Sequence, residues 1–348
     1  MFSLNKILLP AILAIATSAT AQPSFRITSF ISHRDITDSQ KSDIEQYAGG
    51  WAGVMLTDDA AVLSEARSAL ADPLDKRWSM SNTARMHYGE ALLDAFEPFL
   101  SKENKNQMAA VNALQVLSLL GTERSVTTIM RHASSGFESR VAVRQWAAAS
   151  LEDSFQTGRL PLSRLTSIAT LLSDAASREP VWHVASRQLQ ALSSLANTPG
   201  LRRSELLELQ KLSFQLQVQA ISNVLEDIAT LDEATLRMRA VRSGLASLRL
   251  QLIEPNIDAE IKSNTINDLK QVLVRALQVV SEQGQSAWED EELATVYAGA
   301  IETADAMLRR HAGVRDKGDV SLRDAWLSGN NLVLDGVITL WQDQISSR

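Results

Sequence analysis

The feature that most constrains the fold is the helical spacing of apolar residues, which runs through almost every segment after residue 57. Ala, Leu, Gln, Glu and Arg dominate these segments, and most of them are strong helix formers. Alternating apolar and polar runs bounded by turn residues, which would indicate strands, are nearly absent. The sequence therefore predicts an all-α protein.

Capping residues and helix breakers divide the chain into individual helices. Residues 57–59 open a helix that runs to Leu70, where Asp72-Pro73 stops it, and Ser81 opens the next helix. Helices remain short up to about residue 200 and become longer beyond it. Long helices are predicted over 201–230, 232–253, 257–283, 288–312 and 319–345, because each of these stretches carries an apolar stripe with a helical period.

The first 21 residues have the three parts of a secretory signal peptide. Lys6 precedes an apolar run over 7–16, and Ala19-Thr20-Ala21 provides a small-residue cleavage site before Gln22. A retained membrane anchor is the weaker alternative, because the apolar run is too short to span a bilayer. We therefore expect a periplasmic or secreted protein that does not insert into a membrane after signal cleavage.

The mature chain is expected to have three regions. Residues 22–56 are predicted to be an extended or irregular segment, with a strand-compatible stretch at 24–31 and a turn at Gly49-Gly50. Residues 57–199 form a region of shorter helices, and residues 200–348 form either a bundle of long helices or a continuation of the same packing. The boundary is placed near Pro199-Gly200, where the helix length changes.

Charge and residue types exclude several classes of function. The net charge is −7, which argues against a nucleic-acid partner, because binding to the phosphate backbone requires clustered Lys and Arg. The chain has no Cys, and its five His residues lack the spacing of a metal site. No catalytic residue, metal site or cofactor is therefore predicted.

The stretch VAVRQWAAASL at 141–151 has small residues at the centre of its helical face. Val143, Ala147 and Leu151 lie on one face of the helix, since residues three and four apart are neighbours. The alanines allow a second helix to approach closely. Arg144 lies off this face, where it can reach a neighbouring carboxylate or backbone carbonyl.

Related stretches recur at intervals of about 40 residues, the range in which helical repeats are found. Each interval holds two helices separated by a turn. The recurring stretches end at Leu70, Leu114, Leu151 and Leu192. The chain is therefore expected to contain repeated helix pairs over 57–199.

The best of these stretches resembles the second helix of the HEAT-repeat family, which often reads Asp-x-x-Val-Arg-x-x-Ala-Ala-x-Ala-Leu. The matching residues are Val143, Arg144, Ala147, Ala148 and Leu151. The resemblance covers about residues 57–197, and the other copies lack the Val-Arg pair. It implies an α-α superhelix of antiparallel helix pairs, in which the second helices form one curved face that holds a partner.

Two functions from different classes fit this sequence. The favoured one is an exported, non-enzymatic scaffold that binds a protein through Arg144, Trp146 and Trp182, although packing between repeats would also explain both Trp residues. The alternative is an exported α/α-barrel glycoside hydrolase or polysaccharide lyase that uses two carboxylates. The sequence nominates no such pair and does not specify the oligomeric state.

Overall fold

The computed structural model of this 348-residue chain describes residues 26–57, 59–226, 231–283, 290–312 and 321–346. These residues form fourteen α-helices and four short 3-10 helices, and none of them lies in a strand. The predicted all-α class is therefore confirmed. The predicted signal peptide at 1–21 lies outside the described residues.

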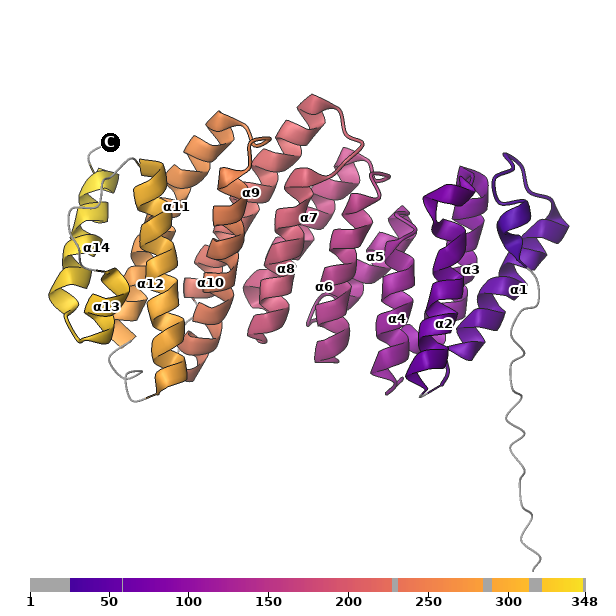
Figure 1. Ribbon diagram of the computed structural model, residues 1–348, viewed down its shortest axis with the longest axis horizontal. Coiled ribbons are helices and arrows are strands. Elements are labelled where there is room, and N and C mark those ends of the chain that lie inside the picture. Colours follow the sequence, from indigo (N-terminus) through magenta and orange to yellow (C-terminus); the bar gives the residue numbers. More distant parts are fainter. Residues whose placement is uncertain (1–25, 58, 227–230, 284–289, 313–320, 347–348) are drawn as a thin grey trace, which may run out of the picture.

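The helices follow one another along the chain with short connections (Figure 1). The first eight are α1 (Asp38–Val54), α2 (Ala60–Ala71), α3 (Asn82–Leu100), α4 (Gln107–Ser118), α5 (Glu123–His132), α6 (Val141–Gln156), α7 (Leu162–Arg178) and α8 (Trp182–Ser194). The last six are α9 (Arg203–Glu226), α10 (Leu231–Ile253), α11 (Ala259–Gln283), α12 (Glu291–Ala312), α13 (Leu322–Leu327) and α14 (Asn331–Ser346). The 3-10 helices are Ile27–Ser29, Asp72–Leu74, Lys76–Trp78 and Leu195–Asn197.

The helices pack in two layers. Layer A contains α1, α3, α5, α7, α9, α11 and α14, and each of these contacts the next member of its layer. Layer B contains α2, α4, α6, α8, α10, α12 and α13, which contact one another in the same order. Figure 1 shows the result as a row of helices with α1 and α14 at opposite ends.

The four recurring stretches of the sequence lie side by side in layer B. They fall in α2, α4, α6 and α8, and each of these helices contacts the next. Their closing leucines, Leu70, Leu114, Leu151 and Leu192, are fully buried. The interval of about 40 residues therefore corresponds to one helix from each layer.

The helix caps that the sequence predicts are present at the first helices of this region. The side chain of Asp59 accepts hydrogen bonds from two backbone N–H groups at the start of α2. Ser81 caps α3 in the same way by accepting from the N–H of Ala84. These contacts satisfy backbone donors that have no partner within the helix.

The prediction of an extended or irregular segment over 22–56 is wrong where α1 and the first 3-10 helix lie. Thr37 and Gln40 form a reciprocal capping box at the start of α1, and the helix buries Ile44 and Tyr47 among others. Gly49-Gly50, predicted as a turn, lies inside α1. Packing against α2 and α3 stabilises the helix in spite of its glycines.

The prediction of a single helix over 319–345 is also wrong. The chain forms the short helix α13 and then α14, with Gly329 between them at a φ of 77°. The N–H of Asn330 donates to the carbonyl of Ala325 at 2.8 Å, which closes the end of α13. A glycine in the left-handed region ends a helix in this way without a steric penalty from a Cβ.

Packing continues across the predicted boundary near Pro199-Gly200. The helix α9, which follows this boundary, contacts both α7 and α8, and α10 contacts α8. Two clusters of buried apolar residues, one N-terminal and one C-terminal, both draw on residues between 176 and 209. The longer C-terminal helices therefore stack directly on the shorter ones.

The loops that follow α6 and α8 pack closely against each other at two glycines. Gly158 follows α6 with a φ of 65°, and Gly200 follows the 3-10 helix after α8 with a φ of 82°. A Cβ at Gly200 would lie only 2.7 Å from the carbonyl oxygen of Gly158. Both the backbone conformation and the close contact therefore require glycine at this position.

Replacing Gly200 with alanine is expected to lower the free energy of unfolding by about 2 kcal/mol, because the left-handed conformation and the contact with Gly158 both oppose a side chain. Urea unfolding would measure the change. Gly49→Ala serves as the control, since a Cβ there meets nothing within 4 Å and lies inside α1. The control should be as stable as the wild type or up to about 1 kcal/mol more stable, and an equal loss in both variants would contradict the explanation.

Candidate functional site

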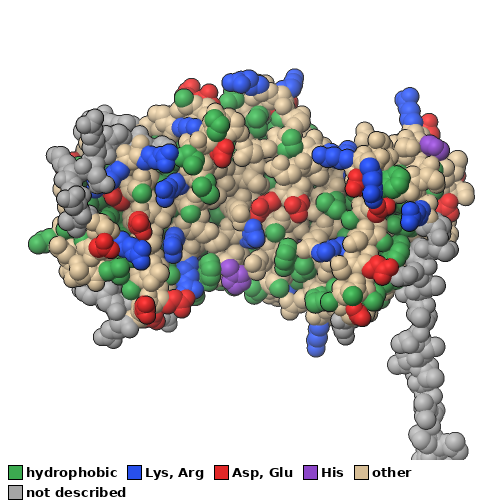
Figure 2. All heavy atoms as spheres, viewed as in Figure 1, with side chains coloured by type: hydrophobic (Ala, Val, Ile, Leu, Met, Phe, Trp, Pro, Cys, Tyr) green, Lys and Arg blue, Asp and Glu red, His purple; other side chains and the backbone are tan. Residues whose placement is uncertain are grey.

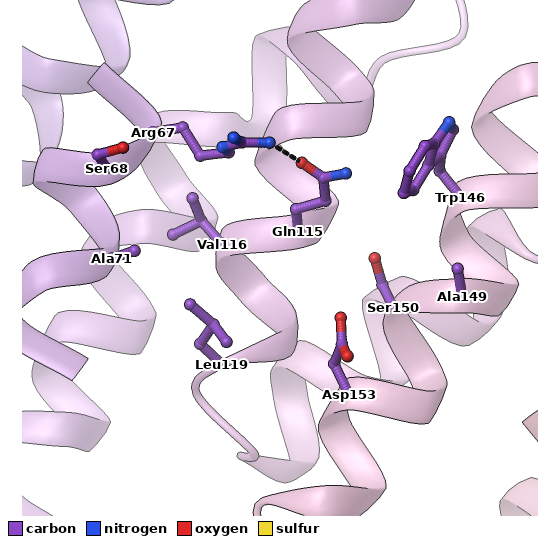
Figure 3. Close-up of a pocket in the computed structure, with 10 residues that line it drawn as sticks. All are labelled: Arg67, Ser68, Ala71, Gln115, Val116, Leu119, Trp146, Ala149, Ser150 and Asp153. Carbon is purple, nitrogen blue, oxygen red and sulfur yellow. Dashed lines mark hydrogen bonds between the residues drawn. The ribbon is translucent and has the colours of Figure 1, made fainter. Parts of the chain in front are cut away.

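A hollow on layer B lies between α2, α4 and α6 and has a volume of about 240 Å3 (Figure 3). The exposed indole of Trp146, with 45% of its surface accessible, lies at its edge. The remaining lining residues are Arg67, Ser68, Ala71, Gln115, Val116, Leu119, Ala149, Ser150 and Asp153. The hollow is therefore built from three of the four recurring helices.

Helical spacing places three different chemical groups of α6 on the same side of the helix. Trp146, Ser150 and Asp153 follow one another at intervals of four and three residues, so their side chains are neighbours on one face. Ser150 is only 2% exposed, and its Oγ has no hydrogen-bond partner among the described residues. Burial raises the pKa of the Asp153 carboxyl above its ordinary value.

The opposite wall of the hollow carries a guanidinium group and an amide. Arg67 Nη1 on α2 donates to Gln115 Oε1 on α4 at 2.7 Å, which fixes both side chains across the helix pair (Figure 3). The hollow thus combines an aromatic ring, a hydroxyl group, a carboxyl group and a guanidinium group. This combination suits the recognition of a side chain that is apolar on one side and polar on the other.

Glu152 lies next to Asp153 on α6 and points toward α8. Burial raises its pKa to about 7, while Arg187 opposes this shift and Asp153 adds to it. Arg187 Nη1 lies 3.6 Å from the Glu152 carboxylate. The ion pair is therefore too long to offset the cost of burying the charge.

Glu152→Gln is expected to become more stable than the wild type as the pH rises from about 4.5 to above 7. The folded-state pKa is above that of the unfolded chain, so the wild type loses stability over this range when Glu152 ionises. The difference should reach about 1 to 2 kcal/mol after allowance for screening by water. Urea unfolding at pH 5 and pH 8 measures it, and an equal difference at both values would contradict the assignment.

Trp182 is less available than Trp146. It is half-buried at the start of α8, and the guanidinium of Arg239 on α10 lies 5.4 Å from its ring centroid. Arg239 in turn pairs with Glu292 on α12. These contacts join three helices of layer B and favour packing between helices over partner binding for this residue.

Arg144, predicted as a binding residue, is buried and engaged within the fold. Its side chain is 4% exposed and makes a two-pronged contact with Glu179, with Nε donating at 3.0 Å and Nη2 at 2.8 Å. Its Nη1 donates to the backbone carbonyls of Glu138 and Ser139. Arg144 therefore holds the start of α6 against the end of α7, and its guanidinium is engaged by contacts within the fold.

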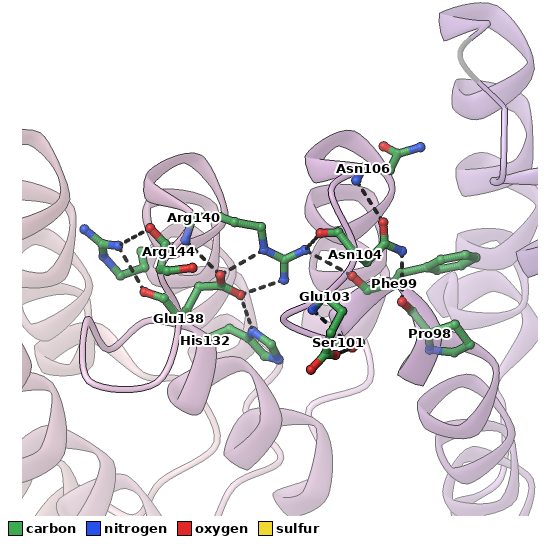
Figure 4. A network of polar contacts seen from close by, with 11 residues as sticks. Pro98, Phe99, Ser101, Glu103, Asn104, Asn106, His132, Glu138, Arg140 and Arg144 are labelled. Carbon is green, nitrogen blue, oxygen red and sulfur yellow. Dashed lines mark hydrogen bonds and ion pairs between the residues drawn. The ribbon is translucent and has the colours of Figure 1, made fainter.

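A second buried charged group lies beside Arg144 (Figure 4). The Glu138 carboxylate accepts hydrogen bonds from Arg140 Nε at 2.9 Å and Nη2 at 2.7 Å, and His132 Nδ1 lies 2.8 Å away. Burial alone would raise the pKa of Glu138, but the hydrogen bonds from Arg140 and His132 outweigh this effect and lower the pKa to about 2. Arg140 also donates to the carbonyl of Asn104 at 2.8 Å, so the network joins the ends of α3, α5 and α6.

The described residues contain no cluster of three or more His, Asp or Glu side chains placed to hold a metal ion. No helix within the same residues is both long enough and apolar enough to span a bilayer. The chain matches none of the protein-family models against which it was compared, and no curated protein matches it. The evidence for a function therefore comes from the geometry of the described residues.

Proposed function

We propose that the chain is an exported, non-enzymatic helical repeat protein that binds another protein on the exposed face of layer B. The observation that carries this proposal is the hollow between α2, α4 and α6, where exposed Trp146 lies beside the unpartnered hydroxyl of Ser150. An exposed aromatic residue beside a preformed hollow is typical of a binding hot spot.

We infer that the two layers form an α-α superhelix of the HEAT type, with residues 200–348 continuing it. Helices pair across the two layers, α1 with α2, α3 with α4 and so on to α13 with α14, and each helix also contacts the next helix of its own layer. A helix pair in such a stack buries its apolar face only against adjacent pairs. The resemblance of 143–151 to the second helix of a HEAT repeat supports the same inference.

The surface charge supports a protein as the partner. The face shown in Figure 2 has acidic, basic and apolar side chains interspersed over most of the row. A nucleic-acid partner would require a continuous basic stripe. The mixed surface is better suited to the short-range polar and apolar contacts of a protein interface.

Trp146→Ala is expected to weaken capture of the partner at least about tenfold, because truncation of a central aromatic residue usually costs more than 1 kcal/mol of binding energy. The test is quantitative recovery of proteins from cell-envelope extract on immobilised mature protein. Leu332→Ala is the control, since Leu332 is 83% exposed on α14, far from the hollow in the row of helices. A partner that both variants recover as well as the wild type does would contradict the placement of the site.

Export is the part of the proposal that depends on the N-terminal sequence alone. Cleavage after Ala21 would give a mature chain that begins at Gln22. Mass spectrometry of the protein purified from its native cell would show this N-terminus. An intact chain that begins at Met1 and is recovered from the cytoplasmic fraction would rule out export.

An α/α-barrel glycoside hydrolase or polysaccharide lyase is the alternative function. A closed barrel brings its first and last helices together, whereas α1 and α14 lie at opposite ends of this row (Figure 1). The described lining of the layer-B hollow has one carboxyl group, while this chemistry requires two. Turnover of a polysaccharide by the pure protein, abolished by one carboxylate substitution, would favour the enzyme.

A further inference from the structure

Layer A carries a larger hollow, and it results from the length of one helix. The helix α5 has 10 residues, whereas α3 and α7 on either side of it in the layer have 19 and 17. The chain leaves α5 at His132 and passes through Gly136 and Phe137 before α6 begins. The space that a longer helix would fill remains open beside α7, with a volume of about 520 Å3.

Apolar side chains form part of this hollow. Met130 on α5 and Ala175 on α7 are buried, and Leu171 on α7 is 48% exposed. Phe137 forms a further wall, and the cationic groups of Arg131 and Lys102 each lie 4.2 Å from its ring centroid. The volume lies in the usual range for small-molecule sites, and these side chains offer a surface for an apolar group.

Three arginines surround the same hollow. Arg131 comes from α5, and Arg164 and Arg178 come from the two ends of α7. Asp174 is the one acidic residue in the lining, and among the described residues no carboxylate lies within 4.0 Å of the three guanidinium groups. A chain with a net charge of −7 therefore has an excess of positive charge at this place.

Arg164 is held in place within the hollow. Its Nη2 donates to Thr127 Oγ1, which holds the guanidinium between α5 and α7. Its Nε is screened from solvent and has no hydrogen-bond partner among the described residues. A guanidinium that a neighbouring hydroxyl group holds in place is favourable for binding an anion, because charge-assisted hydrogen bonds to it require little further ordering of the side chain.

We propose that the hollow between α5 and α7 binds a small amphipathic anion. Its carboxylate, sulfate or phosphate group contacts Arg131 and Arg164, its apolar body contacts Met130 and Leu171, and Arg178 at the far end of the hollow adds long-range attraction. This site lies in layer A, so it is independent of the protein-binding face proposed for layer B. The same chemistry is presented by a free amphiphile and by the headgroup region of an anionic lipid.

The test uses three probes with the same ten-carbon chain and different headgroups: decanoate, decanol and decyltrimethylammonium. Titration calorimetry of the mature protein, below the micelle concentration, is expected to show saturable binding of decanoate at one site. Decanol and the cation should bind at least about tenfold more weakly, because neither makes the charged contacts. Equal binding of all three probes would overturn the proposal.

Arg164→Gln/Arg178→Gln is expected to weaken decanoate binding at least tenfold. The control is Arg202→Gln/Arg203→Gln, which makes the same change in charge at exposed positions near the start of α9. The control should bind as the wild type does, and both double variants should give the wild-type far-UV circular dichroism spectrum. Unchanged decanoate binding in a folded Arg164→Gln/Arg178→Gln variant would overturn the assignment of the site.

Flotation with vesicles distinguishes the two sources of the ligand. Vesicles of phosphatidylcholine with and without phosphatidylglycerol serve as the probes. Arginine-dependent binding to the anionic vesicles would identify a lipid headgroup as the ligand, and binding of decanoate alone would identify a free amphiphile. Absence of arginine-dependent binding in both experiments would overturn the proposal.

Discussion

Replacing Arg144 with alanine is expected to lower the free energy of unfolding by about 3 to 5 kcal/mol, as is usual when one partner of a buried ion pair is removed. Glu179, which would lose its partner, is almost fully buried. Its carboxylate would retain the donor N–H of Val181 but would lose both bonds from the guanidinium. Urea unfolding at neutral pH, with the slope of the transition recorded, would measure the loss.

Two further variants separate this effect from a general loss of charge. Arg202→Ala removes one partner of the exposed pair between Arg202 and Glu205 and should change the stability by no more than about 1 kcal/mol. Arg144→Met/Glu179→Leu removes both buried charges and should recover a large part of the loss, because neither charge then remains unpaired. If Arg144→Ala cost no more than Arg202→Ala, the buried pair would have no structural role.

Acid is expected to remove a second large contribution to stability through Glu138. The pKa of Glu138 is lowered to about 2 in the folded protein, against an ordinary value near 4.5. A lowered folded-state pKa contributes stability that is complete above the unfolded value and disappears as the pH falls toward the folded value. Between pH 4.5 and pH 2 the loss from this one group should be about 3 kcal/mol.

The variant Glu138→Gln isolates this contribution from the other carboxylates. It should be less stable than the wild type at pH 6, because Arg140 loses a charged partner, and the difference should shrink as the pH falls toward 2. Urea unfolding of both proteins at pH 6, 4 and 2.5 would measure the trend. A constant difference at all three values would show that ionised Glu138 does not stabilise the fold.

Much of the helical layout could be predicted from local sequence patterns. Short-range preferences that tertiary packing did not override account for several features. These are the caps at Asp59 and Ser81, the stop at Pro73 and the long C-terminal helices up to α12. The repeat interval could also be predicted from the sequence, because the small and apolar residues that recur are those that pack between helices. The stretches that end at Leu114 and Leu151 accordingly lie on adjacent helices.

The two errors in helix assignment have different physical origins. α1 contains Gly49-Gly50 and forms because its apolar face packs on α3. The break between α13 and α14 depends on a single glycine, Gly329, in the left-handed conformation. The first feature depends on contacts between segments, which local patterns do not contain. The second has a local signal, the glycine at 329, but the apolar stripe over 319–345 masks it.

The candidate sites were only partly predictable. Trp146 could be selected as an exposed aromatic residue, but the pairing of Arg144 with Glu179 joins residues 35 positions apart, and helical spacing contains no information on it. The hollow of layer A was missed for a similar reason. This hollow exists because α5 is shorter than α3 and α7. The difference in length predicts a hollow only when the three helices are known to be neighbours in one layer.

Site-specific photo-cross-linking in the native cell tests the central claim most directly. A photoreactive amino acid is placed at Ala149, in the lining of the layer-B hollow, and in a second strain at Leu171, on the exposed face of layer A. Binding of a protein partner across α2, α4 and α6 predicts a discrete protein adduct from position 149 that Trp146→Ala abolishes. Adducts from position 171 alone, or an adduct from position 149 that persists in Trp146→Ala, would contradict the account.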